Sequence, residues 1–334
     1  EIALPADLTR GPFAGGILNL PAAAIVLLLM TALFTGVKQS AKMNMAIVAV
    51  KLGALAIFIL VASLHVNPSL WHPFMPFGWF SHTTDGKTVG VLAGASLVFF
   101  AYRGFQTVSA AAEESTNPQR DLPIGIIGSL TICTAIYLSV AGLLTAIAPY
   151  MSLNIASPVG FALLQLGYSW GAGLVSVGVV VGLTSTLLIL FYCLTRALFA
   201  MARDRLLPPF FVTLSPRTGT PINATILVGI VTSSIAGLVP IGALAELVNA
   251  NTLVEFALVC TGVIVLRITK PDMPRPFKAR GGLILPVLGI VSCLALLAFL
   301  PVATLQRYVL WLAIGIAFYF LYAARRTGAL TAEA

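Results

Sequence analysis

Three ionisable side chains interrupt stretches of sequence that are otherwise almost entirely apolar. Lys51 lies in AIVAVKLGALAIF, Arg103 in LVFFAYRGFQTVSAAAEE and Glu255 in NANTLVEFALVC. A charge at membrane depth is costly, and such residues usually line a pathway or relay protons. Lys51 could replace a metal cation or carry a proton, although a lysine that extends its ammonium to the membrane surface gives the same pattern. We hypothesise that Glu255 faces Arg103, because few other opposite charges lie at a similar depth.

Arg103 also lies at a predicted interruption of its helix. Gly94 and Gly104 flank a run of aromatic and polar residues in the middle of the apolar stretch. Glycine weakens helix continuity and lets a ligand approach the backbone. A break would expose carbonyl and amide groups that can bind an amine and a carboxylate. The alternative is a continuous helix that packs through its small residues.

Nine apolar blocks are the elements that must position these residues. The 334 residues are 59% hydrophobic and 9% charged, which excludes a soluble globular enzyme, a disordered chain and a nucleic-acid-binding domain. Lipid cannot hydrogen-bond the backbone, so each block is expected to be a helix of an all-α polytopic membrane protein. The blocks are about Ile17–Val37, Ala46–Leu64, Val89–Ala112, Ile124–Ala148, Ala172–Met201, Ile222–Val239, Ala243–Leu266, Leu283–Leu300 and Val309–Ala323.

The distribution of basic residues predicts the orientation of the chain. Of the 19 Lys and Arg residues, fourteen lie in or beside alternate loops or in the C-terminal tail, whereas Arg10, Lys87 and Arg307 lie on the other side. Because cytoplasmic loops are enriched in Lys and Arg, the C-terminus is predicted to be cytoplasmic. This topology explains the net charge of +8 without a nucleic-acid partner. The sequence shows no metal-ligand spacing and no catalytic or nucleotide-binding motif, so we expect no metal, no cofactor and no enzymatic activity.

Longer segments resemble a known family. FFAYRGFQTVSAAAEESTNPQRDLPIGIIGSL is similar to the signature of the amino acid–polyamine–organocation transporters, most of all to the cationic amino acid transporter branch and its bacterial homologues. The segments TRALFAMARDRLLPPFF, TPINA and CTGVIVLRITKPDMPRPFKA resemble the same branch. The resemblance implies a fold of twelve helices with two inverted repeats and broken helices, of which the nine blocks correspond to the last nine.

The same resemblance implies a division of the chain. Residues 1–64 are expected to end the first repeat with two helices, residues 65–87 to form an extracellular loop, and residues 88–267 to form the complete second repeat of five helices. Residues 268–282 are expected to form a cytoplasmic loop, and residues 283–334 the last two helices and a cytoplasmic tail. The first three helices of the family would precede Glu1, and they include the other broken helix, which holds the substrate carboxylate. This sequence is therefore expected to carry half of the binding site.

The resemblance also implies substrate-binding residues at the break. Backbone carbonyls of Phe100, Ala101 and Arg103, beside Gly104, would hold the substrate α-amine, and Phe105 would close over the substrate.

Coupling residues and departures from the family pattern follow from the same comparison. Lys51 resembles a lysine that takes the place of a sodium ion in sodium-independent members, and Ser185 and Thr186 lie near that space. Relatives usually have an apolar residue, an aspartate and a small or apolar residue at the positions of Arg103, Gln106 and Glu255, and Asn251 also departs from the pattern. Neutral or unusual amino acids and amine-type substrates therefore stay open beside cationic ones.

Residues and resemblance together predict a secondary active amino acid transporter of the cell membrane. It would work by alternating access, driven by H⁺ rather than Na⁺ or by exchange of substrates. The alternatives are a polyamine or other amine transporter or antiporter of the same fold, a channel or sensor, and a truncated remnant that does not transport.

Overall fold

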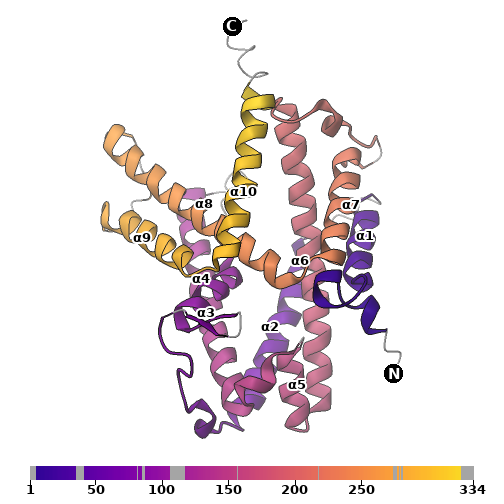
Figure 1. Ribbon diagram of the computed structural model, residues 1–334, viewed down its shortest axis with the longest axis vertical. Coiled ribbons are helices and arrows are strands. Elements are labelled where there is room, and N and C mark those ends of the chain that lie inside the picture. Colours follow the sequence, from indigo (N-terminus) through magenta and orange to yellow (C-terminus); the bar gives the residue numbers. More distant parts are fainter. Residues whose placement is uncertain are drawn as a thin grey trace, which may run out of the picture. The chain divides into compact units, whose positions relative to one another are not determined.

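The chain is built from apolar helices (Figure 1). The computed structural model describes residues 5–34, 41–80, 82–84, 87–105, 117–155, 157–216, 218–273, 277, 279 and 281–324. Two compact units are present. The first comprises Glu1–Val61, Ile155–Gly242 and Leu310–Ala334, and the second comprises Ala62–Asn154 and Ala243–Val309.

Every predicted apolar block contains a helix in the part of the chain that the structure describes. Five helices are long and apolar enough to cross a membrane: Met45–Ser63, Pro118–Ile147, Ser169–Arg203, Ile241–Thr269 and Val302–Tyr322. Shorter apolar helices occupy the other blocks, at Leu20–Phe34, Val91–Tyr102, Ile222–Leu238 and Ile284–Ala298. The prediction of an all-α polytopic membrane protein is confirmed.

The first unit contains α1, most of α2, α5, α6, α7 and the end of α10. Their bounds are α1 Leu20–Phe34, α2 Ala41–Ser63, α5 Pro158–Gln165, α6 Ser169–Arg203, α7 Ile222–Leu238 and α10 Val302–Phe318, which continues as a π-helix over Tyr319–Ala323. Figure 1 shows α1 and α7 side by side next to the long α6, and all three helices are in contact. Val26, Leu33, Phe191 and Val228 form the buried core between them.

Small residues at every fourth position let α7 approach α1 closely. Thr225, Gly229, Ser233 and Gly237 are all buried. The Ser233 hydroxyl donates to the carbonyl of Ala23 at 3.1 Å, and the carbonyl of Gly237 accepts from the backbone N–H of Asn19 at 2.9 Å. Such stripes bring helix backbones together in membranes, where the hydrophobic effect does not drive association.

The second unit contains α3, η4, α4, α9, most of α8 and the start of α10. Their bounds are α3 Val91–Val98, η4 Phe99–Tyr102, α4 Pro118–Ile147, α8 Ile241–Thr269 and α9 Ile284–Ala298. A core of Ala250, Leu253, Cys293, Leu300 and Tyr308 joins α8, α9 and α10. The expected extracellular loop adds two short antiparallel strands, β1 (His82–Thr84) and β2 (Lys87–Val89), which the sequence analysis did not predict.

Several helices begin earlier than their apolar blocks, and α4 and α10 differ most. α4 begins at Pro118 rather than near Ile124, and Pro123 lies inside it. α10 begins at Val302 rather than Val309, so Arg307 lies in the helix and not in the expected loop. Proline is tolerated at the first helical position because the N–H that it lacks would have no partner within the helix. The first turns of a helix can extend beyond the apolar segment. The apolar pattern locates the membrane segment of a helix rather than its ends.

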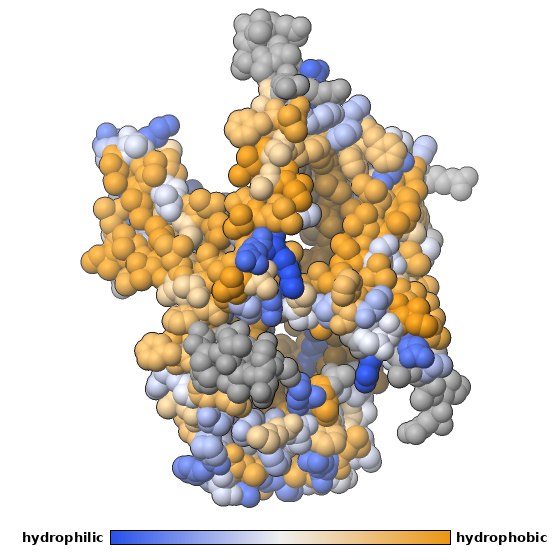
Figure 2. All heavy atoms as spheres, in the orientation of Figure 1, coloured by the Kyte–Doolittle hydropathy of each residue, from blue (hydrophilic) through white to orange (hydrophobic). Residues whose placement is uncertain are grey.

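Apolar side chains cover the outside of the helices as well as the core. Figure 2 shows hydrophobic residues over most of the visible surface of α8 and α9. Leu258, Ile284 and Leu288 are 66%, 68% and 57% exposed. Exposing such an apolar surface to water would be unfavourable. The exterior of these helices is therefore suited to contact with lipid.

Gly229→Leu is expected to destabilise the first unit. A Cβ atom at Gly229 would lie 2.3 Å from the Met30 sulfur and 2.8 Å from its Cγ. Overpacking of this kind costs about 1–3 kcal/mol, so the thermal unfolding midpoint of the purified protein in detergent should fall. Gly173→Leu in α6 is the matched control, because a Cβ there meets nothing within 4 Å. Equal midpoints for the two variants would contradict the proposed close contact of α1 and α7.

Candidate functional site

The third predicted membrane segment is interrupted where the sequence analysis expected. α3 ends at Val98, a 3-10 turn covers Phe99–Tyr102, and Arg103 is extended with φ −66° and ψ 133°. Gly104 follows with φ +128°, a conformation that side chains other than glycine rarely adopt. The alternative of a continuous helix is thus wrong for the described residues. Gln106, the neighbouring candidate, lies outside them.

Asn249 of α8 binds the end of α3. Its side-chain amide donates to the carbonyls of Ser96 at 3.0 Å and Leu97 at 3.1 Å, and Asn249 is 1% exposed. The last carbonyls of a helix lack their usual N–H donor, and lipid cannot supply one. This amide serves the Ser96 carbonyl and adds a second donor to that of Leu97, which also accepts from the N–H of Phe99. The sequence analysis missed Asn249 and selected Asn251, which is exposed. The available signal was an amide within an apolar block, which both residues share.

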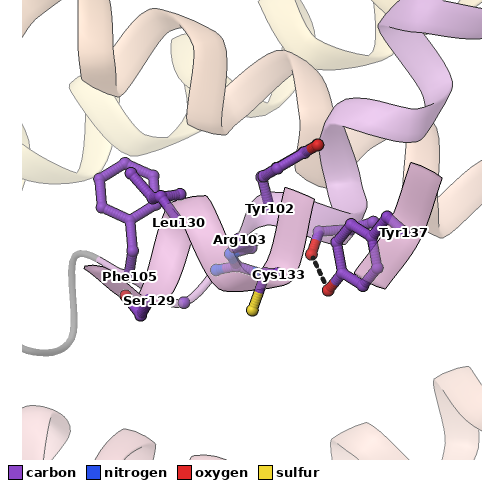
Figure 3. A pocket seen from close by; sticks show the side chains of 9 residues that line it. Tyr102, Arg103, Phe105, Ser129, Leu130, Cys133 and Tyr137 are labelled. Carbon is purple, nitrogen blue, oxygen red and sulfur yellow. Dashed lines mark hydrogen bonds between the residues drawn. The ribbon is translucent and has the colours of Figure 1, made fainter. Parts of the chain in front are cut away.

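Two of the three carbonyls expected to hold an amine already accept one hydrogen bond each. The Tyr137 hydroxyl of α4 donates to the carbonyl of Ala101 at 3.0 Å, marked by the dashed line in Figure 3. The backbone N–H of Arg103 donates to the carbonyl of Phe100 at 3.1 Å. A carbonyl oxygen has two lone pairs, so each can accept a second bond from a ligand. Tyr137 is a site residue that the sequence analysis did not identify.

A pocket of about 270 Å³ opens beside the break. Figure 3 shows the η4 end and the face of α4 that line it. Its lining residues are Ala101, Tyr102, Arg103, Gly104, Phe105, Ser129, Leu130, Cys133 and Tyr137. Four of the five residues predicted to bind substrate therefore line one pocket, and the fifth, Phe100, lies next to them in the chain.

Aromatic rings frame the break. Phe105 lies with its ring centroid 5.2 Å from that of Phe256 in α8, and Phe99 packs edge-on against the same ring at 5.9 Å. Tyr102 and Tyr137 form another edge-on pair at 5.4 Å. Phe105 is therefore held by α8, in a place where a ring can cover a ligand bound at the break.

Arg103 and Glu255 form no ion pair within the described residues. Both side chains are exposed. The salt bridge found there joins Arg203 to Asp204 at 3.4 Å. In the second unit, the Glu246 carboxylate of α8 accepts a hydrogen bond from the buried Thr304 hydroxyl of α10. Glu246 was not among the residues predicted from the sequence.

Lys51 meets α6 in the first unit. Its ammonium donates to the carbonyl of Gly182 at 3.3 Å and to the Thr186 hydroxyl at 3.4 Å. A Cβ atom at Gly182 would lie 2.2 Å from Lys51 Cε, so the glycine makes room for the lysine side chain. Ser185, the other predicted neighbour, is buried in the adjacent position. The structure thus brings Lys51 and Thr186 together.

No cluster of three or more His, Cys, Asp and Glu side chains that could hold a metal ion lies among the described residues. At Lys51, a cation is held by a backbone carbonyl and a hydroxyl oxygen. Around the break, the structure presents backbone carbonyls, the Arg103 guanidinium and aromatic rings. These groups can bind a small polar molecule and fix its orientation.

Comparisons with known proteins cover nearly the whole chain. A family model described as amino acid permease matches residues 15–322. The methylthioribose transporter of Bacillus subtilis is 41% identical over 329 residues, which are 98% of this chain and 69% of that protein. The branched-chain amino acid permease BcaP of the same organism is 40% identical over 331 residues, with the same coverage. The vacuolar cationic amino acid transporter 4 of Arabidopsis thaliana is 36% identical over 272 residues, which are 80% of this chain and 45% of that protein.

Asn249→Leu is expected to destabilise the broken end of α3. The Ser96 carbonyl would lose the Asn249 donor, and the Leu97 carbonyl would keep only the N–H of Phe99. The cost is about 1–3 kcal/mol, and the thermal unfolding midpoint in detergent should fall. Asn251→Leu is the matched control on the same helix, because that side chain is exposed, and it should leave the midpoint nearly unchanged. A control variant as unstable as Asn249→Leu would show that Asn249 does not stabilise the break.

Proposed function

Because this chain belongs to the amino acid permease family, we propose that it is a secondary active transporter that moves amino acids across the cell membrane by alternating access. The observation that carries the proposal is the break of α3 beside a pocket of about 270 Å³, in a segment whose backbone offers carbonyls to a ligand. Broken helices of this kind bind substrates near the bilayer midplane in transporters.

The substrate ammonium would bind to the carbonyls of Phe100, Ala101 and Arg103. The first two have each spent one lone pair on a protein donor, and their second lone pair is what an ammonium would use. A Cβ at Gly104 would meet nothing within 4 Å, so the backbone can be approached there. Phe105, with Gly104 before it, would cover the bound molecule.

Lys51 would couple transport to protons rather than to sodium. Its ammonium already lies against two oxygens of α6, which are the ligand type that a sodium ion would need. The charged ammonium makes these contacts, so the lysine would join α2 to α6 at the place where a sodium ion would otherwise bind. Ser185 lies beside them as a further polar group.

The orientation and the repeat boundaries are part of the proposal. The C-terminus would be cytoplasmic, following the basic loops. Residues 88–267 would form one five-helix repeat, residues 1–64 the end of the other, and residues 283–334 the last two helices and the tail. Glu255 and Asn251 are exposed and lie outside the lining of the pocket beside the break. Together with Gln106 they would add polarity to other parts of the cavity.

A second candidate substrate class is a neutral thioether sugar. The methylthioribose transporter is 41% identical to this chain, about as similar as the branched-chain amino acid permease at 40%. A ribose offers hydroxyls where an amino acid offers an ammonium, and carbonyl oxygens accept hydrogen bonds from both.

Saturable counterflow is the expected result for the purified protein reconstituted in proteoliposomes. Vesicles preloaded with an unlabelled amino acid should accumulate the labelled one transiently, because a carrier exchanges bound substrates across the membrane. Preloading with methylthioribose tests the second candidate in the same assay. Flux that rises linearly with concentration, without stimulation by preloading, would indicate a channel instead.

Lys51→Met is expected to lower uptake driven by a proton gradient by roughly tenfold, because the hydrogen bonds of a charged group are lost. A tenfold change corresponds to ~1.4 kcal/mol. Wild-type uptake should depend on the pH gradient and stay unchanged when sodium is replaced. Lys42→Met is the matched control, because Lys42 is exposed and lies on the same helix. Uptake that stops without sodium, or equal rates in the two variants, would contradict proton coupling through Lys51.

A further inference from the structure

Arg103 brings a positive charge into the pocket beside the helix break. Its side chain lines the pocket together with Ser129 and Cys133 of α4 (Figure 3). Within the described residues, its guanidinium has neither an ion pair nor a hydrogen bond. An arginine is always charged and carries five N–H donors, so this guanidinium offers a full set of donors to a ligand.

The rest of the described lining is neutral. It consists of aromatic, small and apolar residues with the hydroxyls of Tyr102, Ser129 and Tyr137. The Ser129 and Tyr137 hydroxyls donate their protons to the carbonyls of Ile126 and Ala101, so they present oxygen lone pairs rather than donors to the pocket. Arg103 is therefore the side chain there that can attract an anion.

The chemistry of the break favours a carboxylate as that anion. A guanidinium is stabilised by a partner of opposite charge, and its planar shape matches the two oxygens of a carboxylate. The carbonyls of Phe100 and Ala101, which lie three and two residues before Arg103 in the chain, could each accept a second hydrogen bond from an ammonium. One short stretch thus offers both an acceptor for an ammonium and a donor for a carboxylate.

We propose that the Arg103 side chain binds a carboxylate of the substrate in this pocket, an inference that rests on the proposed function. Arg103 then acts as a specificity-determining residue that selects zwitterionic or acidic amino acids over compounds that carry only an amine. Since the resemblance assigns the substrate α-carboxylate to the family's other broken helix, a carboxylate on the substrate side chain is the partner that we expect for the guanidinium. The α-carboxylate is the other source, and the test distinguishes the two.

Two pairs of compounds distinguish the α-carboxylate from a side-chain carboxylate as the group that Arg103 binds. Leucine and leucinamide differ only at the α-carboxylate, and glutamate and glutamine differ only at the side-chain carboxylate. Binding is measured as the rise in thermal unfolding temperature of the purified protein in detergent, and transport as competition with labelled substrate in proteoliposomes. In at least one pair, the wild type should bind the compound with the carboxylate more tightly than its amide, by on the order of tenfold in apparent affinity. This is the magnitude expected for hydrogen bonds between charged groups.

Arg103→Leu should abolish this preference, and Arg103→Gln should do the same while keeping a polar side chain. The unfolding temperature without ligand shows whether each variant is folded, and either folded variant suffices for the test. Arg307→Leu is the control, because Arg307 is an exposed arginine of the same unit that does not line the pocket; it should keep the wild-type preference.

An unchanged preference in the folded variants, or amides that bind as well as acids to the wild type, would overturn the inference. Failure of the proposed function looks different. Carboxylated compounds would then stabilise the wild type but not the Arg103 variants, and none would be transported.

Discussion

The constraint on which the second unit depends is that backbone carbonyls freed inside a membrane must find donors within the protein. Breaking α3 frees several of them at once. Asn249 of α8 donates to two, at Ser96 and Leu97, and Tyr137 of α4 donates to that of Ala101. Lipid offers no donor, so an unsatisfied carbonyl would cost several kcal/mol. The break is therefore held open by side chains from two other helices, and the pocket is the space that these contacts leave.

The two cations at membrane depth are accommodated in different ways. Lys51 extends over Gly182 and ends against oxygens of α6, so its charge is solvated by the protein itself. Arg103 lines a pocket without a carboxylate partner among the described residues. The contacts of the Lys51 ammonium link α2 to α6 within the first unit. A charge without such a partner is suited to binding an external anion, because binding supplies the missing partner.

The helices and the break could be predicted because their signals are local. Apolar blocks, the glycines around Arg103 and isolated charges are all visible within a short window of sequence. The partners of the break could not be predicted. Asn249 lies 153 residues from Ser96, and nothing near it in the sequence distinguishes it from the exposed Asn251. The first residues of α4 and α10 were predicted too late in the sequence for a related reason, because both helices begin before the apolar residues that indicate them.

The relatives narrow where substrate selection can reside. Proteins 41% and 40% identical to this chain are named for methylthioribose and for branched-chain amino acids, which share little beyond polar groups on a small scaffold. Backbone carbonyls accept from either hydroxyls or an ammonium, so the break alone discriminates weakly between them. Discrimination must then come from side chains that differ in charge and shape around a common break. In this chain the described lining contributes a single charged side chain, that of Arg103, and this is where an acidic group of a substrate gains most from binding.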